Sequence, residues 1–136
     1  MGESEHSSRL EAAQAFVMHL GHRDFERCMA LLSETVTYKV PGYGPLAGGL
    51  VGHDAVAGHL ADLVARTGGS YDSLKWVDWM VGEDHVAVLA EIHMQGSGQR
   101  YVGPVLFLLS FDGGDKITGI VVFLEDVASV THVLGG

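Results

Sequence analysis

Residues 74–125 read LKWVDWMVGEDHVAVLAEIHMQGSGQRYVGPVLFLLSFDGGDKITGIVVFLE, and this stretch decides the fold. It contains four apolar runs, separated by short turns rich in glycine and acidic residues. Connections this short join antiparallel neighbours. We therefore predict an antiparallel meander of four strands, over Leu74–Val81, His85–Gln95, Arg100–Phe111 and Lys116–Glu125.

The first half of the chain has helical spacing instead. Apolar residues recur every three or four positions from Leu10 to Leu20, and again after the candidate helix caps Asp24 and Asp54. This spacing predicts three helices, preceded by a flexible polar segment over residues 1–8. A short strand, Thr35–Val40, is expected between the second and third helices, because Pro41 and Gly42 stop it.

A chain that begins with helices and ends with a meander of strands is predicted to have an α+β fold, here in one domain over residues 1–136. We expect a curved antiparallel sheet shaped like a cone, with the three N-terminal helices packed on its concave face. The mouth of such a cone can hold a small molecule. Pro104 lies inside a strand, where it removes a hydrogen-bond donor, so a bulge or an edge position is expected there.

Composition excludes several classes of protein. The chain is 47% apolar, which excludes a disordered chain, and its net charge of −9 argues against nucleic acid or an anionic membrane as a partner. Cys28 is the single cysteine, and its apolar helical setting predicts an inert buried thiol. The sequence shows neither a signal peptide nor a membrane span, so we expect a soluble cytoplasmic protein.

Ionisable residues in the second meander strand suggest acid–base chemistry. Side chains alternate along a strand, so Glu91 and His93 share one face, about 7 Å apart. That spacing lets each tune the other or contact one ligand, although a solvated strand end would look the same. The opposite face carries only apolar residues, which predicts a homodimer through the outer face of the sheet. These residues are Val86, Val88, Ala90, Ile92 and Met94.

Other candidate site residues lie at strand ends. Tyr38 ends the first strand and is either a core residue or a hydrogen-bond donor to substrate. Strand parity allows only one of Glu125 and Asp126 to point inward, and we favour Glu125. Aromatic residues are expected to line the pocket: Trp79, Phe123 and Tyr43. Trp76 and Trp79 have opposite parity, so one is expected in the core and the other at a pocket or interface.

Several familiar site motifs are missing. The histidines and carboxylates do not form a cluster with metal-ligand spacing, so we predict no metal. The glycine-rich loop over residues 42–49 lacks the lysine of a phosphate loop, and neither GxGxxG nor GxSxG is present. We therefore expect no cofactor.

From about Leu10 onward, the chain resembles the SnoaL-like branch of the nuclear transport factor 2-like, or ketosteroid isomerase-like, superfamily. The resemblance rests on the opening helices and on residues 38–42, 45–48, 52–56, 67–69, 114–117 and 125–126. It implies a single SnoaL-like domain. The superfamily hosts isomerases, cyclases, epoxide hydrolases and non-enzymes, so the fold alone does not identify the chemistry.

The chain departs from better-known members of the superfamily, and these departures narrow the chemistry that the resemblance implies. The ketosteroid isomerase pattern needs a tyrosine and an aspartate where this chain has Phe16 and Val40. The limonene-epoxide hydrolase pattern needs an arginine that is missing here, while Tyr38 matches its pocket tyrosine. A Tyr, a His and a Glu at these places look most like the SnoaL-like cyclases that open an epoxide with an internal hydroxyl.

The resemblance thus implies a cofactor-free cyclase or isomerase acting on an apolar natural-product intermediate. Either intramolecular epoxide opening to a cyclic ether or an aldol-type ring closure fits. His93, paired with Glu91 or Glu125, would be the base, and Tyr38 or a protonated Glu125 the acid. The alternatives are a non-catalytic small-molecule binding protein, an epoxide hydrolase and a purely structural dimerisation module.

Overall fold

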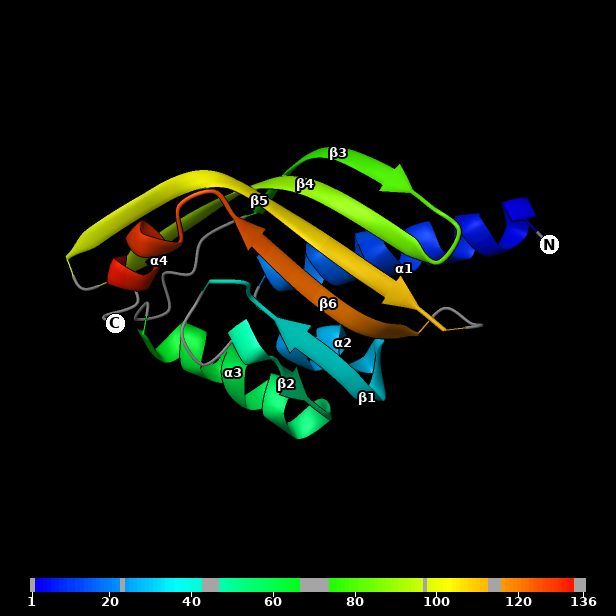
Figure 1. The fold of residues 1–136 in the computed structure, drawn as a ribbon, viewed down its shortest axis with the longest axis horizontal. Coiled ribbons are helices and arrows are strands. Elements are labelled where there is room, and N and C mark those ends of the chain that lie inside the picture. Colours follow the sequence, from blue (N-terminus) through cyan, green and yellow to red (C-terminus); the bar gives the residue numbers. More distant parts are fainter. Residues whose placement is uncertain are drawn as a thin grey trace.

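The computed structural model describes residues 2–22, 24–42, 47–66, 74–96, 98–112 and 116–133. Its elements, in chain order, are α1 (Gly2–Gly21), α2 (Phe25–Ala30), β1 (Leu32–Lys39), β2 (Leu50–Val51), α3 (His53–Arg66), β3 (Leu74–Val81), β4 (His85–Gly96), β5 (Gln99–Phe111), β6 (Ile117–Leu124) and α4 (Val127–Val133). Figure 1 shows one curved sheet with α1, α2 and α3 gathered on one side and α4 near the start of β5.

The sheet confirms the predicted meander and adds to it. Its strand order is β2-β1-β6-β5-β4-β3, and β3 to β6 pair antiparallel in sequence order. β1, however, pairs parallel with β6, so the sheet is mixed and not purely antiparallel as expected. The chain between these two strands is long enough to return to the same end of the sheet, which a parallel pair requires.

The concave face carries the core. Along β4 the buried row is Val86, Val88, Ala90, Ile92 and Met94, with at most 4% of any side chain exposed. We had expected this row on the outer face, in a dimer interface, and that expectation is wrong. α1 packs against β3 and β4, and α3 against β1 and β2, so the helices cover the more apolar row. Burying the more apolar row under the helices removes more apolar surface from water.

The outer face of the sheet is also largely apolar. Register places Leu106 opposite both Leu89 and Phe123, and Leu108 opposite Val121. Within this face Phe123 is 43% exposed and Val102 47% exposed. The structure thus leaves an apolar surface, built from other residues than those predicted, on the side away from α1 to α3.

Both ends of the chain differ from expectation. α1 begins at Gly2, so the segment expected to be flexible is helical. Extending a helix into solvent requires no new apolar contact, only modest helix propensity. Farther along α1, Arg9 is 6% exposed and donates to the backbone oxygen of Glu83, which ties α1 to the β3–β4 turn. α4 was not predicted at all, although Asp126 accepts from the backbone N–H of Ser129 as an N-terminal cap.

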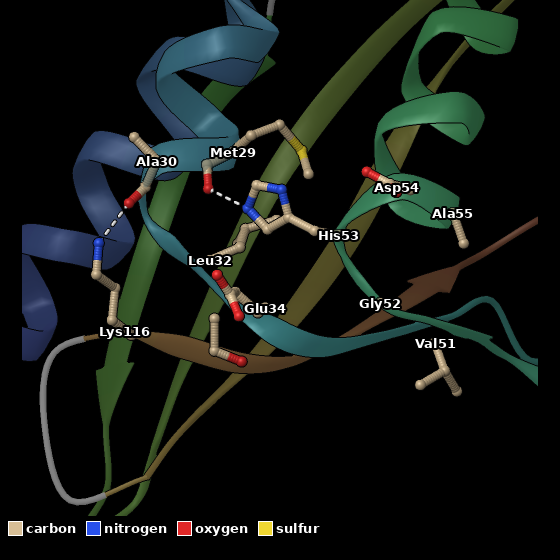
Figure 2. Close-up of a pocket in the computed structure, with 11 residues that line it drawn as sticks. Met29, Ala30, Leu32, Glu34, Val51, Gly52, His53, Asp54, Ala55 and Lys116 are labelled. Carbon is tan, nitrogen blue, oxygen red and sulfur yellow. Dashed lines mark hydrogen bonds between the residues drawn. The ribbon is translucent and has the colours of Figure 1, made fainter.

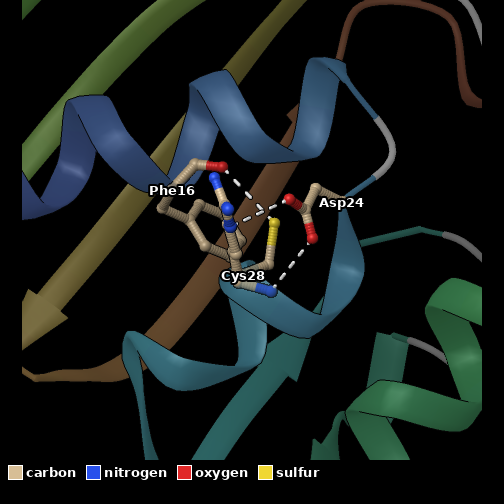
Figure 3. A network of polar contacts seen from close by, with 4 residues as sticks. Phe16, Asp24 and Cys28 are labelled. Carbon is tan, nitrogen blue, oxygen red and sulfur yellow. Dashed lines mark hydrogen bonds and ion pairs between the residues drawn. The ribbon is translucent and has the colours of Figure 1, made fainter.

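Cys28 has the structural role that the sequence predicted. Its thiol is fully buried and donates to the backbone oxygen of Phe16 at 3.6 Å, which joins α2 to α1 (Figure 3). Burial, with a smaller contribution from the Asp24 charge, raises the pKa of the Cys28 thiol from 9.0 to about 12. The thiol therefore stays protonated and unreactive at neutral pH.

Pro104 lies where β5 has lost one neighbour. It pairs with Glu91 on β4 without a register shift, whereas the last β5–β6 pair is Val105 with Leu124. From Pro104 back to Gln99, β5 is therefore an edge on its β6 side. This confirms the expected edge position, where a missing N–H is tolerated.

Candidate functional site

Tyr38 lies on the inner face of the sheet. It pairs with Leu50 on β2 and Ile120 on β6, and 7% of it is exposed. Its ring lies against the imidazole of His59 on α3, with the centroids 4.8 Å apart and the planes tilted by 54°. A phenol and an imidazole, both able to move protons, thus meet between the sheet and the helix that covers it.

His59 sits at the edge of the buried side of α3. Val56 and Leu60, three residues before it and one after, are fully buried, while His59 itself is half-buried. Burial lowers the pKa of His59 below 6.5, and the Asp62 carboxylate partly opposes the shift. A neutral imidazole at neutral pH is suited to accept a proton.

Sequence reasoning missed His59. The available signal was the position of His59 beside the apolar stripe that contains Val56 and Leu60. That stripe had to face the sheet, so a histidine at its edge had to face it too.

Glu91 and His93 do contact each other, as their spacing suggested. His93 Nε2 lies 2.7 Å from Glu91 Oε1, and the two side chains are 26% and 43% exposed, respectively. The pair lies on the outer face, however, where register places Glu91 opposite Pro104 and His93 opposite Val102. It therefore does not line the interior of the cone.

The four predicted catalytic residues do not converge on one cavity. Tyr38 pairs with Ile120, which pairs with Leu109, and all three lie in the buried core on the inner face. His93 lies on the other face of the same sheet. Strand parity correctly grouped Glu91 with His93, but parity says only which residues share a face and not which face the helices cover.

The predicted aromatic walls separate in the same way. Trp79 pairs with Val88 and packs against the core, so it lies on the inner face. Phe123 lies on the outer face, which corrects its assignment to the pocket wall. A register shift between Trp76 and Asp78 interrupts the alternation of β3, so parity does not relate the two tryptophans, and the side chain of Trp76 lies outside what the structure describes. Tyr43 lies outside the described residues.

Glu125 and Asp126 lie beside a tyrosine that the sequence did not single out. Both carboxylates are exposed. Asp126 accepts from the backbone N–H and the hydroxyl of Ser129, at 3.0 Å and 2.7 Å, and these bonds lower its pKa. Burial, followed by the charges of Glu125 and Asp126, raises the pKa of Tyr101, while a hydrogen bond from the Asp126 backbone opposes the shift. Asp126 is thus engaged in capping α4, which leaves Glu125 as the carboxylate available for other contacts.

A groove of about 930 Å³ opens elsewhere, between α2, β1 and the start of α3 (Figure 2). His53 Nε2–H donates to the backbone oxygen of Met29 at 2.7 Å, and Lys116 Nζ donates to that of Ala30 at 2.6 Å. Both side chains therefore donate to backbone carbonyls at the end of α2, which the helix itself leaves without partners. His53 thus begins α3 and joins it to the end of α2.

The described residues offer little to hold a metal or an anion. Within them, no three His, Cys, Asp or Glu side chains come together as a metal site. Arg9 is the one buried charged side chain of the same set, and it is engaged with Glu83. No helix in the described part of the chain is long and apolar enough to cross a membrane.

Residues 13–120 match the family model of the SnoaL-like domain. The chain belongs to this family. No curated protein sequence matches it significantly.

Solved structures share the fold of this SnoaL-like protein at low sequence identity. Bal32a, from a soil-derived mobile gene cassette, is 16% identical with a TM-score of 0.85, over 96% of this chain and 98% of that one. TerC, co-crystallised with polyporic acid, is 21% identical with a TM-score of 0.78, over 95% and 99%. A Mycobacterium tuberculosis protein in complex with estradiol-17β-hemisuccinate is 18% identical with a TM-score of 0.74, over 87% and 94%.

Proposed function

We propose that this SnoaL-like protein is a cofactor-free acid–base enzyme, a cyclase or isomerase, that binds an apolar organic molecule inside the cone. The observation that carries the proposal is the contact between Tyr38 and His59 on the inner face. A phenol beside a neutral imidazole supplies a proton donor and a proton acceptor.

The setting of this pair supports an apolar substrate. The inner face beside Tyr38 is apolar, with Ile120 and Leu109 on the neighbouring strands and Leu60 on α3. Two proteins of the same fold were crystallised with ring-shaped organic compounds, polyporic acid and a steroid derivative. A natural-product intermediate such as a polyketide or terpenoid suits such an environment.

Two reactions remain open for this site. In epoxide opening, a substrate hydroxyl loses its proton, forms a C–O bond, and the epoxide oxygen gains a proton. In aldol-type closure, a carbon loses its proton and the resulting enolate attacks a carbonyl. Both need one base and one acid and leave the substrate's composition unchanged. Tyr38 is the proposed acid in each case.

A mass-spectrometric screen separates the proposal from its alternatives. The purified protein is incubated with polyketide and terpenoid epoxides and with polyketones, alongside its Tyr38→Phe variant. We expect a product of unchanged mass from the wild type and much less of it from the variant. A product heavier by one water indicates an epoxide hydrolase, and binding without any product indicates a non-catalytic binding protein.

We also propose that the protein forms a homodimer through the outer face of the sheet. Leu106, Phe123 and Val102 give this face an apolar surface that a second copy would remove from water. The Glu91–His93 pair would then lie within the interface. Light scattering at micromolar concentration tests this proposal, and a monomeric mass contradicts it.

A further inference from the structure

We propose that His59 is the catalytic base and that it forms a closed proton relay with Tyr38. His59 takes the substrate's proton, Tyr38 gives its own proton to the substrate's oxygen, and the His59 imidazolium then reprotonates Tyr38. This inference rests on the proposed function, because it assigns the second half of the same site.

The two rings are in direct contact. Their centroids are 4.8 Å apart, and the tilt of 54° differs from the parallel arrangement of a stacked pair. The two elements that carry the rings are fastened together, because the Gly52 N–H, just before α3, donates to the Val36 oxygen of β1 at 2.7 Å. The pair is therefore held by a helix and a strand, which position side chains more precisely than loops do.

The protonation states fit the assigned roles. Burial keeps His59 neutral at neutral pH, because the charged imidazolium loses more solvation than the neutral ring. Asp62, three residues later on α3, partly offsets this effect and stabilises the imidazolium once it forms. Among the described residues, Asp62 is the charged group that shifts the pKa of His59.

The proton balance closes without an added reactant. In epoxide opening, the hydroxyl proton moves to His59, the oxygen bonds to the epoxide carbon, and the epoxide C–O bond breaks. The released alkoxide takes the Tyr38 proton, leaving a phenolate beside an imidazolium. Transfer of one proton between these neighbours restores both residues. The net reaction is an isomerisation, which needs neither oxidant nor water.

The same site favours an uncharged substrate. Among the described residues the inner face offers no lysine or arginine to pair with a carboxylate or phosphate, since Arg9 is engaged with Glu83. The net charge of −9 further disfavours an anion. The substrate class is therefore a neutral hydroxy-epoxide or polyketone.

The experiment compares His59→Gln, Tyr38→Phe and the double variant, with His22→Gln as a control in the exposed α1–α2 connection. We expect each single change to lower kcat/KM on the substrate found by the screen by at least roughly 100-fold. The double variant should lose little more than either single one, because the two residues act as a unit. His22→Gln should match the wild type, and circular dichroism should confirm that all variants fold. Full turnover in His59→Gln, with turnover lost in Tyr38→Phe, overturns the relay while the proposed function stands.

A second measurement needs no substrate. The imidazole of His59 is titrated by NMR in the wild type and in Tyr38→Phe. We expect a pKa below 6.5 in the wild type, and a different pKa once the neighbouring hydroxyl is removed. Identical titration in the two proteins shows that the hydroxyl and the imidazole do not interact, and this overturns the relay even if the screen finds no reaction and the proposed function fails.

Discussion

Tyr38 and His93 lie on opposite faces of one sheet. Tyr38 belongs to the buried inner face and contacts His59, whereas His93 bonds Glu91 on the outer face. Any site that uses Tyr38 must therefore take its second group from the helices and not from the outer side of β4. The experiments below follow from this separation.

Replacing Tyr38 by Phe should lower kcat by roughly 100-fold or more, with a smaller change in substrate affinity. The substitution removes one hydroxyl and keeps the ring that packs against His59. Steady-state kinetics and calorimetric binding measure the two effects separately. Equal loss of binding and turnover would mean that the hydroxyl only holds the ligand.

Replacing His93 by Gln should leave turnover unchanged and the chain folded, because the Glu91–His93 pair lies on the face of the sheet opposite to Tyr38. Kinetics and urea denaturation check this. A large loss of turnover in a variant that folds and assembles normally would show that His93 takes part in catalysis.

The stability of the protein should fall as the pH drops below about 6.5, in part through His59. Its pKa is lower in the folded chain than in the unfolded one, so the unfolded state binds more protons in this range. This loss of stability is absent above the unfolded pKa of His59, and it grows as the pH falls from there through the folded pKa. Urea denaturation between pH 7.5 and 5.5, about one unit above and below the unfolded pKa of about 6.5, measures the slope. His59→Gln should show a shallower slope; an unchanged slope would contradict the burial of a neutral imidazole.

Replacing Gly103 by Ala should destabilise the protein by about 1–3 kcal/mol. A Cβ at this position would overlap the Tyr101 hydroxyl, so the buried Tyr101 ring would have to shift. Gly58→Ala is the matched control, since a Cβ there meets nothing within 4 Å and lies in the middle of α3. The control should gain up to about 1 kcal/mol from helix propensity. Thermal denaturation of both variants compares them.

Replacing Phe123 by Glu should convert the proposed dimer to a monomer without unfolding it. Phe123 is already 43% exposed, so a charge there costs the isolated chain little, whereas it would be buried against a second copy. Light scattering gives the mass, and circular dichroism confirms the fold. A dimer that persists in this variant would place the interface elsewhere.

The sequence by itself determined the local structure and the pairing of neighbours. Apolar alternation and short turns located β3 to β6 within a residue or two at their ends, and Asp24 and Asp54 located the starts of α2 and α3 to within a residue. Spacing also predicted that Glu91 and His93 would share a face, and they are hydrogen-bonded. These features depend on residues close together in the chain, where periodicity and turn chemistry act directly.

Only the tertiary structure decided which face of each strand lies inside. Both faces of β4 are largely apolar, so alternation could not tell the row from Val86 to Met94 from the row that carries Glu91 and His93. The choice was made by α1, which packs on the row of β4 that buries more apolar surface, and by the bulge near Trp76 that shifts the register of β3. The same packing brought His59 against Tyr38, a contact between residues on a helix and a strand that no local pattern encodes.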